Sequence, residues 1–297
     1  MIVVFGCDQR FLPHLSVAIT SLLNNNADTN ISIYIIHSDI SAEEWDKLIG
    51  LDLHKKHTFI NAKVSGGELD DLVTRGQFTK AIYYRLLIET IVPDDKVLYI
   101  DADVVVNGSL KVLWNLDITD TYLAAVEEPV YTNHQLEMLP DARYFNSGVM
   151  LINLKRWRKE FISNQVLEFI RTKTHTLIWL DQCALNAVIN GKWKRVSPKY
   201  NLQTFIFEMD AELRERRYDF GDIQEAIKNP VIIHYTGYSK PWHTLNEHPY
   251  KNKYWHYLRM TPYKRTLPMD ITPKRFVLWC LPKSLRNTIR NYFQDKN

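Results

Sequence analysis

The chain alternates short apolar runs with segments in which apolar residues recur every three or four positions. Such runs predict strands buried on both faces of a parallel sheet, and the periodic segments predict helices that cover it. The expected strands are Ile2–Gly6, Ile31–His37, Thr58–Val64, Val97–Ile100, Tyr122–Val126, Val149–Leu154 and Val231–Ile233. The expected helices begin at Pro13 and after the capping box Ser41 and Glu44, and cover Thr79–Thr90, Lys155–Glu168 and Cys183–Ile189. This alternation predicts an α/β fold with helices on both sides of the sheet.

The central strand ends in two closely spaced carboxylates. The segment Lys96–Val106 reads KVLYIDADVVV, so Asp101 and Asp103 follow a buried run directly. Alternate side chains of extended backbone point the same way, which lets both carboxylates converge on one point. Hard divalent cations prefer such oxygen ligands together with substrate phosphates. The pattern therefore indicates either a Mg²⁺ or Mn²⁺ site that holds a diphosphate, or an Asp-rich turn at a strand end.

Other polar residues follow neighbouring strands. In parallel sheets, ligands bind beyond the carboxyl ends of the strands, and this rule places Asp8 on the same rim as the aspartate pair. The loop that contains Asp8 has neither a G-x-G-x-x-G nor a Walker pattern. Asp8 can contact a nucleotide base or ribose, or it can cap the following helix. Asp181 likewise suits the start of the helix that follows it.

The segment His234–Trp242, HYTGYSKPW, follows the last predicted strand. A neutral imidazole at a strand end can serve as a third metal ligand. Lys240 can reach a phosphate as a point charge, and Gly237 permits close approach of the backbone to a ligand. Together with the aspartate pair, these residues describe a clamp for a metal and a diphosphate.

Composition fits a globular protein, with 45% hydrophobic and 24% charged residues in 297. The three cysteines are scattered without metal-binding spacing, which favours a reducing compartment over a disulfide framework. We find no secretory signal and no apolar run long enough to span a membrane. We therefore expect a cytoplasmic protein.

The net charge of +3 hides a basic C-terminal end, because eleven Lys and Arg but only two Asp lie beyond residue 250. A Pro-punctuated linker, Tyr263–Lys274, precedes an apolar cluster, Phe276–Leu281. A short basic amphipathic helix is expected after them, from Leu285, Ile289, Tyr292 and Phe293 with Lys283, Arg286 and Arg290. Such a helix either packs on the domain or anchors the protein to an anionic membrane surface. Nucleic acid is not expected as a partner, because no recognition module accompanies these basic residues.

Residues 1–260 resemble glycosyltransferase family 8, the retaining nucleotide-sugar glycosyltransferases. The resemblance rests on the opening strand with Asp8, on Tyr84-Arg85, and on KVLYIDADVVV. It continues through YFNSGVMLIN (Tyr144–Asn153), Leu180-Asp181-Gln182 and HYTGYSKPW. The likeness is greatest to the bacterial lipopolysaccharide and lipooligosaccharide galactosyl- and glucosyltransferases.

The resemblance implies a GT-A type, Rossmann-like catalytic domain over residues 1–260 with a mixed, mostly parallel sheet, and a basic tail over 261–297. It implies that Asp101, Asp103 and His234 ligate Mn²⁺, with Mg²⁺ as the alternative, and that the ion bridges the diphosphate of a UDP-sugar. Asp8 would contact the uracil or ribose, and Gly237 and Lys240 the diphosphate. The remaining implied donor-site and acceptor-site residues are Ala102 beside the metal, Arg85, Asn146, Asp181 and Gln182 around the sugar, and Glu128 at the acceptor. Gln9-Arg10 departs from the family pattern, in which an acidic or amide residue is often followed by Asn.

The expected reaction transfers a hexose, galactose or glucose, from the UDP-sugar to a hydroxyl of a saccharide or lipid-linked oligosaccharide, with retention. Asp181 and Gln182 are the candidate catalytic residues at the floor of the sugar pocket. The amide of Gln182 is a poor nucleophile, which favours same-face attack over double displacement. Two alternatives remain open: a phosphohydrolase that uses Asp101 as nucleophile, and a non-catalytic saccharide-binding protein.

Overall fold

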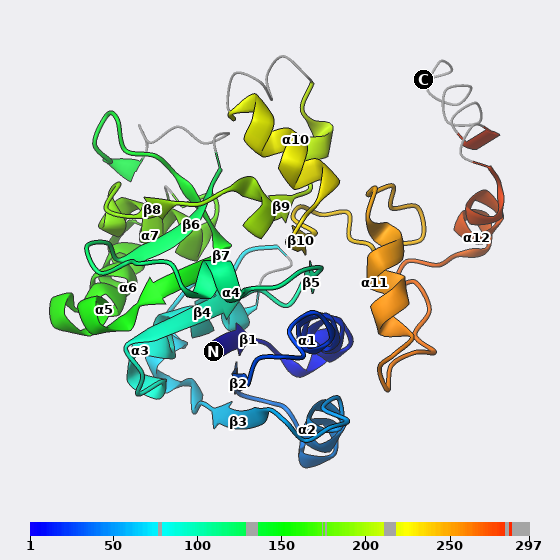
Figure 1. The fold of residues 1–297 in the computed structure, drawn as a ribbon, viewed down its shortest axis with the longest axis horizontal. Helices are drawn as coiled ribbons and strands as arrows, with labels where there is room; N and C mark the ends of the chain where they lie inside the picture. The colour runs from blue at the N-terminus through cyan, green and yellow to red at the C-terminus, as the bar shows by residue number, and fades with distance from the viewer. Residues whose placement is uncertain are drawn as a thin grey trace.

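The computed structural model describes residues 1–76, 79–128, 136–173, 175, 177–210, 218–282 and 285–286, and a mixed sheet of seven strands lies at the centre of this part (Figure 1). In spatial order the strands are β3 (Thr58–Lys63), β2 (Ser32–His37), β1 (Ile2–Gly6), β4 (Lys96–Ile100), β7 (Phe145–Asn153), β6 (Leu123–Glu127) and β8 (Lys194–Arg195). The first four run parallel, β7 runs antiparallel to β4 and β6, and β8 is parallel to β6. The predicted α/β fold with a mostly parallel sheet is confirmed.

A second sheet of three strands lies beside the carboxyl end of β4, within the same described residues. Its order is β5 (Val104–Val106), β10 (Ile232–His234) and β9 (Leu202–Gln203), with β10 antiparallel to β5 and parallel to β9. The chain therefore leaves the large sheet at Asp101 and enters the small one at Val104. Because His234 pairs with Val104, this register brings the imidazole next to Asp103.

Helices cover both faces of the large sheet, as the sequence predicts (Figure 1). Along β4, Val97 and Tyr99 belong to a core on one face with α6 (Ile162–Lys173) and α7 (Leu180–Ile189). Leu98 and Ile100 belong to the core on the other face with α1 (Leu12–Asn25) and α2 (Ala42–Ile49). The remaining helices are α3 (Ile88–Ile91), α4 (Lys111–Trp114), α5 (Leu154–Glu160), α8 (Phe205–Glu208), α10 (Phe220–Lys228), α11 (Lys251–Leu258) and α12 (Pro273–Cys280), with 3₁₀ helices at Gln9–Phe11, Gly66–Leu69, Lys80–Leu87 and Pro198–Tyr200.

Two helices expected as single units are each divided. The predicted helix Thr79–Thr90 is a 3₁₀ helix, Lys80–Leu87, followed by the short α3. The buried Arg85 lies in this tight coil, and bonds to residues far along the chain hold its side chain, so tertiary contacts outweigh local propensity here. The predicted helix Lys155–Glu168 is α5 and then α6, because Phe161 adopts a left-handed conformation with φ of 52° and ends α5.

Boundaries near the rim also differ from the prediction. Strand β7 begins at Phe145, four residues before the expected Val149, and β10 ends at His234 instead of Ile233. Helix α7 begins at Leu180, so Asp181 and Gln182 lie in its first turn and do not precede it. These shifts place the polar motif residues inside regular elements, where the backbone holds them rigidly.

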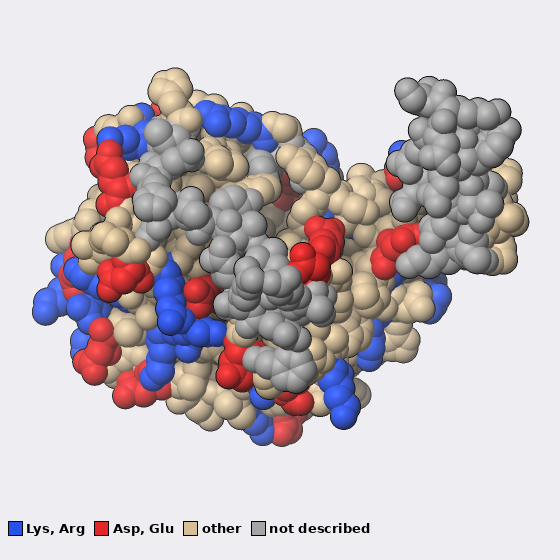
Figure 2. All heavy atoms as spheres, turned by 90° about the horizontal axis from the view of Figure 1, so that it is seen from above, with Lys and Arg blue, Asp and Glu red and all other residues tan. Residues whose placement is uncertain are grey.

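The C-terminal part packs on the domain as far as Asp270. Helix α11 contributes to a core with α1, and the carboxylate of Asp270 accepts a hydrogen bond of 2.7 Å from the backbone N–H of Thr244. Beyond this point α12 buries no residue and stands apart from the body of the molecule at the right of Figures 1 and 2. The expected helix around Leu285 cannot be followed further, because Lys283, Ile289, Arg290, Tyr292 and Phe293 lie outside the described residues.

Candidate active site

A cavity of about 440 Å³ opens at the carboxyl ends of β1 and β4. It is lined by many of the residues singled out in the sequence: Asp8, Arg85, Asp101, Ala102, Asp103, Asp181, Gln182 and Lys240. Asn146 and His234 are buried and hydrogen-bonded to one another through a third side chain, Asn201. Glu128 is buried as well, and neither it nor Gly237 is part of the cavity lining.

The predicted metal ligands come together from three places in the sequence. Ligand atoms of Asp101, Asp103 and His234 all lie within 4.8 Å of one another. The imidazole Nε2 of His234 is 3.2 Å from Asp103 Oδ1 and 3.9 Å from Asp101 Oδ2. Two carboxylates and one imidazole are a donor set that suits Mn²⁺ or Mg²⁺.

Gly148 makes this convergence sterically possible. A Cβ atom at position 148 would lie 2.2 Å from Cε1 of His234 and 2.6 Å from Oδ2 of Asp101, well inside van der Waals contact. The backbone carbonyl of Gly148 also accepts the N–H of Asp101 at 2.8 Å, which fixes the strand pair at the rim. The residues present therefore fit a small cation, held where only a glycine leaves room for the imidazole.

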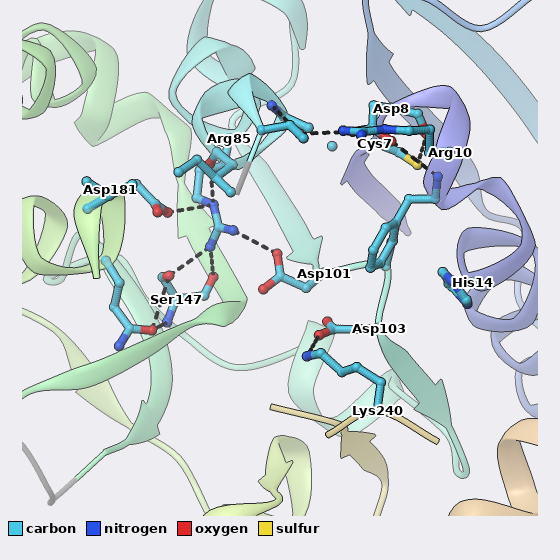
Figure 3. A pocket seen from close by; sticks show the side chains of 18 of the residues that line it. Cys7, Asp8, Arg10, His14, Arg85, Asp101, Asp103, Ser147, Asp181 and Lys240 are labelled. Carbon is cyan, nitrogen blue, oxygen red and sulfur yellow. Dashed lines mark hydrogen bonds and ion pairs between the residues drawn. The ribbon is translucent and has the colours of Figure 1, made fainter. Parts of the chain in front are cut away.

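The positive charge of Arg85 pairs with two carboxylates of the site, those of Asp101 and Asp181 (Figure 3). Its Nη2 lies 2.8 Å from Asp101 Oδ1, and its Nε lies 3.0 Å from Asp181 Oδ2. Nη1 donates to the carbonyl and the hydroxyl of Ser147 at 2.7 and 2.8 Å, and the guanidinium lies 4.6 Å from the centre of the Tyr99 ring. Burial raises the pKa of Asp181 to about 6, although Arg85 opposes this shift. Asp181 faces the cavity as a carboxylate near its titration point.

Lys240 forms the other ion pair at the rim, 2.6 Å from Asp103 Oδ2 (Figure 3). The ammonium also donates to the backbone carbonyl of Tyr235 at 2.5 Å. Gly237, with φ of 82°, supplies the left-handed turn between His234 and Lys240. Burial alone would raise the pKa of Asp103, but Lys240 and His234 hold it well below its usual range. Asp103 is therefore a carboxylate at every physiological pH.

Asp8 caps a helix, and its contact with a nucleotide base or ribose stays a prediction. Its Oδ1 accepts the N–H of Phe11 at 3.2 Å, so it caps the 3₁₀ helix Gln9–Phe11. Its Oδ2 accepts the hydroxyl of Thr79 at 2.9 Å and also faces the cavity. Arg10, where the sequence departs from the family pattern, lies 3.4 Å from the same carboxylate oxygen.

Gln182 is held at both ends of its amide. Its Oε1 accepts the N–H of Ser147 at 3.0 Å, and its Nε2 donates to Glu128 Oε2 at 3.1 Å. Asn146 donates to the same oxygen of Glu128 at 2.8 Å. Burial raises the pKa of Glu128, and these two donors oppose the shift. Glu128 thus lies behind the residues that line the cavity, where it orients the side-chain amides of Asn146 and Gln182.

Sequence reasoning missed two groups of residues in and around the site. Phe11, His14 and Trp242 form an aromatic wall of the cavity, with the rings of His14 and Trp242 stacked 3.5 Å apart. Trp242 belongs to the HYTGYSKPW motif and Phe11 follows Asp8, so their positions gave a signal. Asn201 and Ser147 support His234 and Arg85, and only the fold brings these pairs together.

The sequence matches the model of glycosyl transferase family 8 over residues 2–246. General stress protein A of Bacillus subtilis strain 168 is 31% identical over 86% of this chain and 91% of its own length. The lipopolysaccharide 1,2-glucosyltransferase of Escherichia coli K12 is 27% identical over 90% of this chain and 80% of its own length. The crystal structure of galactosyltransferase LgtC in complex with donor and acceptor sugar analogues shows the same fold, with a TM-score of 0.77. It is 24% identical in sequence, and the match covers 91% of this chain and 98% of the LgtC chain. The chain belongs to glycosyltransferase family 8.

Proposed function

We propose that this protein is a metal-dependent, retaining hexosyltransferase that moves galactose or glucose from a UDP-sugar to a saccharide hydroxyl, in the synthesis of lipopolysaccharide or another surface glycan. The observation that carries the proposal is the convergence of Asp101, Asp103 and His234, with both aspartates and Lys240 lining one cavity. Relatives named as a lipopolysaccharide glucosyltransferase and a galactosyltransferase support a hexose donor.

In this proposal each side chain has a role toward the leaving diphosphate. Bound Mn²⁺ or Mg²⁺ supplies Lewis-acid stabilisation of the charge on the departing diphosphate. Asp101, Asp103 and His234 hold the ion, with Ala102 between them against the nucleotide. Lys240 presents a second positive charge from the same rim, next to Gly237. The carboxylate of Asp8 faces the part of the cavity assigned to the uracil or ribose.

The sugar pocket would lie between Arg85 and the first turn of α7. Arg85 pairs with both Asp101 and Asp181, which reduces the repulsion between these two carboxylates. Asp181 can therefore accept hydrogen bonds from sugar hydroxyls next to the metal site. The amide of Gln182 is engaged by Ser147 and Glu128, which makes it a positioned dipole and a poor nucleophile. This arrangement favours same-face attack assisted by the leaving phosphate. An acceptor contact for Glu128 would require movement of the cavity floor, because its carboxylate is occupied by Asn146 and Gln182.

The alternatives fit the site less well. A phosphohydrolase needs a free aspartate nucleophile, whereas Oδ1 of Asp101 is bonded to Arg85 and Tyr99 at 2.8 and 2.7 Å. A pure saccharide binder has no use for two carboxylates and an imidazole held together at an energetic cost. Family membership also favours glycosyl transfer.

The experiment is a panel of UDP-sugars with a saccharide acceptor, followed by UDP release, with the anomeric configuration of the product read by NMR. We expect turnover of UDP-galactose or UDP-glucose and retention at the anomeric carbon. An inverted linkage would contradict both mechanistic versions, and a phosphoenzyme trapped on Asp101 would favour the phosphohydrolase.

We also propose that the C-terminal end holds the enzyme at an anionic membrane surface on the cytoplasmic side, where a lipid-linked acceptor is presented. Helix α12 exposes three large apolar side chains, Phe276 (48%), Val277 (60%) and Trp279 (45%). The basic surplus beyond residue 250 has the charge that anionic lipid attracts. Within the described residues, no helix combines the length and apolar character needed to cross a membrane. On this proposal residues 1–260 are the catalytic domain and the tail, 261–297, acts as the surface anchor through its part beyond Asp270, because residues up to Asp270 pack on the domain.

A further inference from the structure

His234 is bound on both sides of its ring. Its Nδ1 lies 2.8 Å from the side-chain oxygen Oδ1 of Asn201, and its Nε2 faces the carboxylates of Asp103 and Asp101. Both His234 and Asn201 are buried, so water does not compete for these contacts. A neutral imidazole carries its proton on one nitrogen only, and a metal requires the lone pair of the other.

The orientation of Asn201 is fixed by its other neighbour. Its Nδ2 donates to Oδ1 of Asn146 at 2.9 Å. That oxygen also accepts the backbone N–H of Gly148 at 3.0 Å, while Nδ2 of Asn146 donates to Glu128 Oε2 at 2.8 Å. A backbone N–H can only donate, so the atom of Asn146 that faces Gly148 must be its side-chain oxygen. Asn146 therefore has one allowed amide orientation, and through it Asn201 has one as well.

The direction of this chain of hydrogen bonds decides the state of the histidine. Because Asn201 must present its oxygen to His234, the imidazole must donate from Nδ1. Nε2 is then the nitrogen that faces the two aspartates and that can offer its lone pair to a bound metal ion. The same oxygen of Glu128 accepts from Gln182 at 3.1 Å, so one buried side chain connects the metal side and the sugar side of the cavity.

We infer that Asn201 is a positioning residue that keeps a proton on Nδ1 of His234, with the N–H of Gly148 fixing the direction of the hydrogen-bond chain. The inference rests on the proposed function only in that Nε2 is the metal-binding atom. It assigns no contact with substrate to Asn201 or Glu128. Groups that orient a metal-binding histidine typically change metal affinity by about 10- to 100-fold when they are removed.

The first test reads the tautomer directly in the metal-free protein. ¹⁵N NMR of histidine-labelled protein distinguishes a protonated from an unprotonated ring nitrogen, and the spectrum of His234→Gln identifies the signals of residue 234 among the ten histidines. We expect Nδ1 to be protonated in the metal-free protein and with Mg²⁺ bound, whether or not Nε2 carries a proton beside the free carboxylates. An unprotonated Nδ1 in the wild type would overturn the inference, whatever the variants do.

The second test measures the affinity for Mn²⁺ alone, by electron paramagnetic resonance of the free ion. Asn201→Leu should lose about 10- to 100-fold in affinity and show a mixture of tautomers. Asn201→Asp, which restores an acceptor for Nδ1–H, should bind Mn²⁺ more tightly than the leucine variant. The matched control is Asn26→Leu, which removes another buried amide, one that bonds to Leu22 and Leu110 away from the cavity.

The outcomes separate this inference from the proposed function. Equal Mn²⁺ affinity in the wild type and a folded Asn201→Leu would contradict the positioning role, as would an equal loss in Asn26→Leu. A wild type that shows Nδ1–H but binds no Mn²⁺ would contradict the proposed metal dependence and leave the tautomer assignment standing. If Asn201→Leu does not fold, the wild-type spectrum and Asn201→Asp still decide the question.

Discussion

Nζ of Lys240 lies 2.6 Å from Oδ2 of Asp103, although 137 residues separate them in the sequence. The pair closes the rim of the cavity opposite Arg85 and Asp101 (Figure 3). The carboxylate of Asp103 therefore belongs to the candidate metal site and also pairs with Lys240. In the proposed function Lys240 also contacts the diphosphate. Its contribution to binding can therefore be measured by comparing UDP with uridine, which has no diphosphate.

We predict that Lys240→Met weakens binding of UDP much more than binding of uridine. A charge-assisted hydrogen bond contributes about 1.5–3 kcal/mol, which corresponds to roughly 10- to 100-fold in affinity. Isothermal titration with UDP and with uridine, both in the presence of Mn²⁺, measures the difference. Equal losses for the two ligands would show that Lys240 supports the cavity without contacting the diphosphate.

We predict that Gly148→Ala disrupts the metal site. The added methyl group would overlap the imidazole of His234 and the carboxylate of Asp101, so Mn²⁺ affinity should fall by more than about tenfold. Overpacking should also lower the free energy of unfolding by about 1–3 kcal/mol. The control is Gly108→Ala, whose methyl group would meet its nearest neighbour at an ordinary 3.6 Å. Unchanged Mn²⁺ binding by Gly148→Ala would contradict the site geometry.

Acid should destabilise the protein through His14. Burial against Trp242 lowers the pKa of His14 to about 3, from 6.5 for the exposed side chain. The unfolded state therefore takes up a proton first, and the stability that the neutral ring contributes above pH 6.5 is lost as the pH falls toward 3. Between pH 7 and pH 4 this loss is about 3 kcal/mol.

Urea unfolding of the wild type and of His14→Phe at pH 7 and pH 4 tests this assignment. The phenylalanine variant should lose less stability on acidification, because it has no group to protonate at this position. It should keep some acid sensitivity, since burial also lowers the pKa of His248, to about 4. The same pH dependence in both proteins would show that His14 titrates normally in the folded state.

The apolar face of α12 should mediate membrane attachment. We expect the wild type to float with phosphatidylserine vesicles and to bind more weakly at high salt, because screening reduces the attraction between its basic residues and the lipid. The double variant Phe276→Ser with Trp279→Ser should lose this binding. Leu53→Ser is the control, because Leu53 is 85% exposed in a different part of the chain. Equal flotation of all three proteins would contradict the attachment proposal.

The strands and the three candidate metal ligands were predictable because they depend on local patterns. Apolar runs mark β1 and β4, and the alternation of extended backbone places Asp101 and Asp103 together. The position of His234 followed from a second motif after the last strand. What the sequence did not predict was how they meet, through an antiparallel β5–β10 pair that is separate from the main sheet.

The supporting residues were hidden because their roles arise only from tertiary contacts. Asn201 lies 33 positions before His234 in a loop without a motif. The resemblance assigned Glu128 to the acceptor and gave no sign that it is buried and bonded to Asn146 and Gln182. The predicted helix Thr79–Thr90 is divided where Arg85 makes its tertiary contacts. These contacts are with Ser147, Asp101 and Asp181. Local propensity carries no information about such distant contacts.

In the proposed function, Asp101, Asp103 and His234 hold a divalent cation on which sugar transfer depends. The measurement is UDP release from UDP-galactose or UDP-glucose with Mn²⁺ and with EDTA, in the wild type and in Asp103→Asn and His234→Ala. We predict activity that requires the metal and is almost completely lost in both variants, with their fold retained. Full activity of the wild type in EDTA, or of either variant with Mn²⁺, would contradict the account.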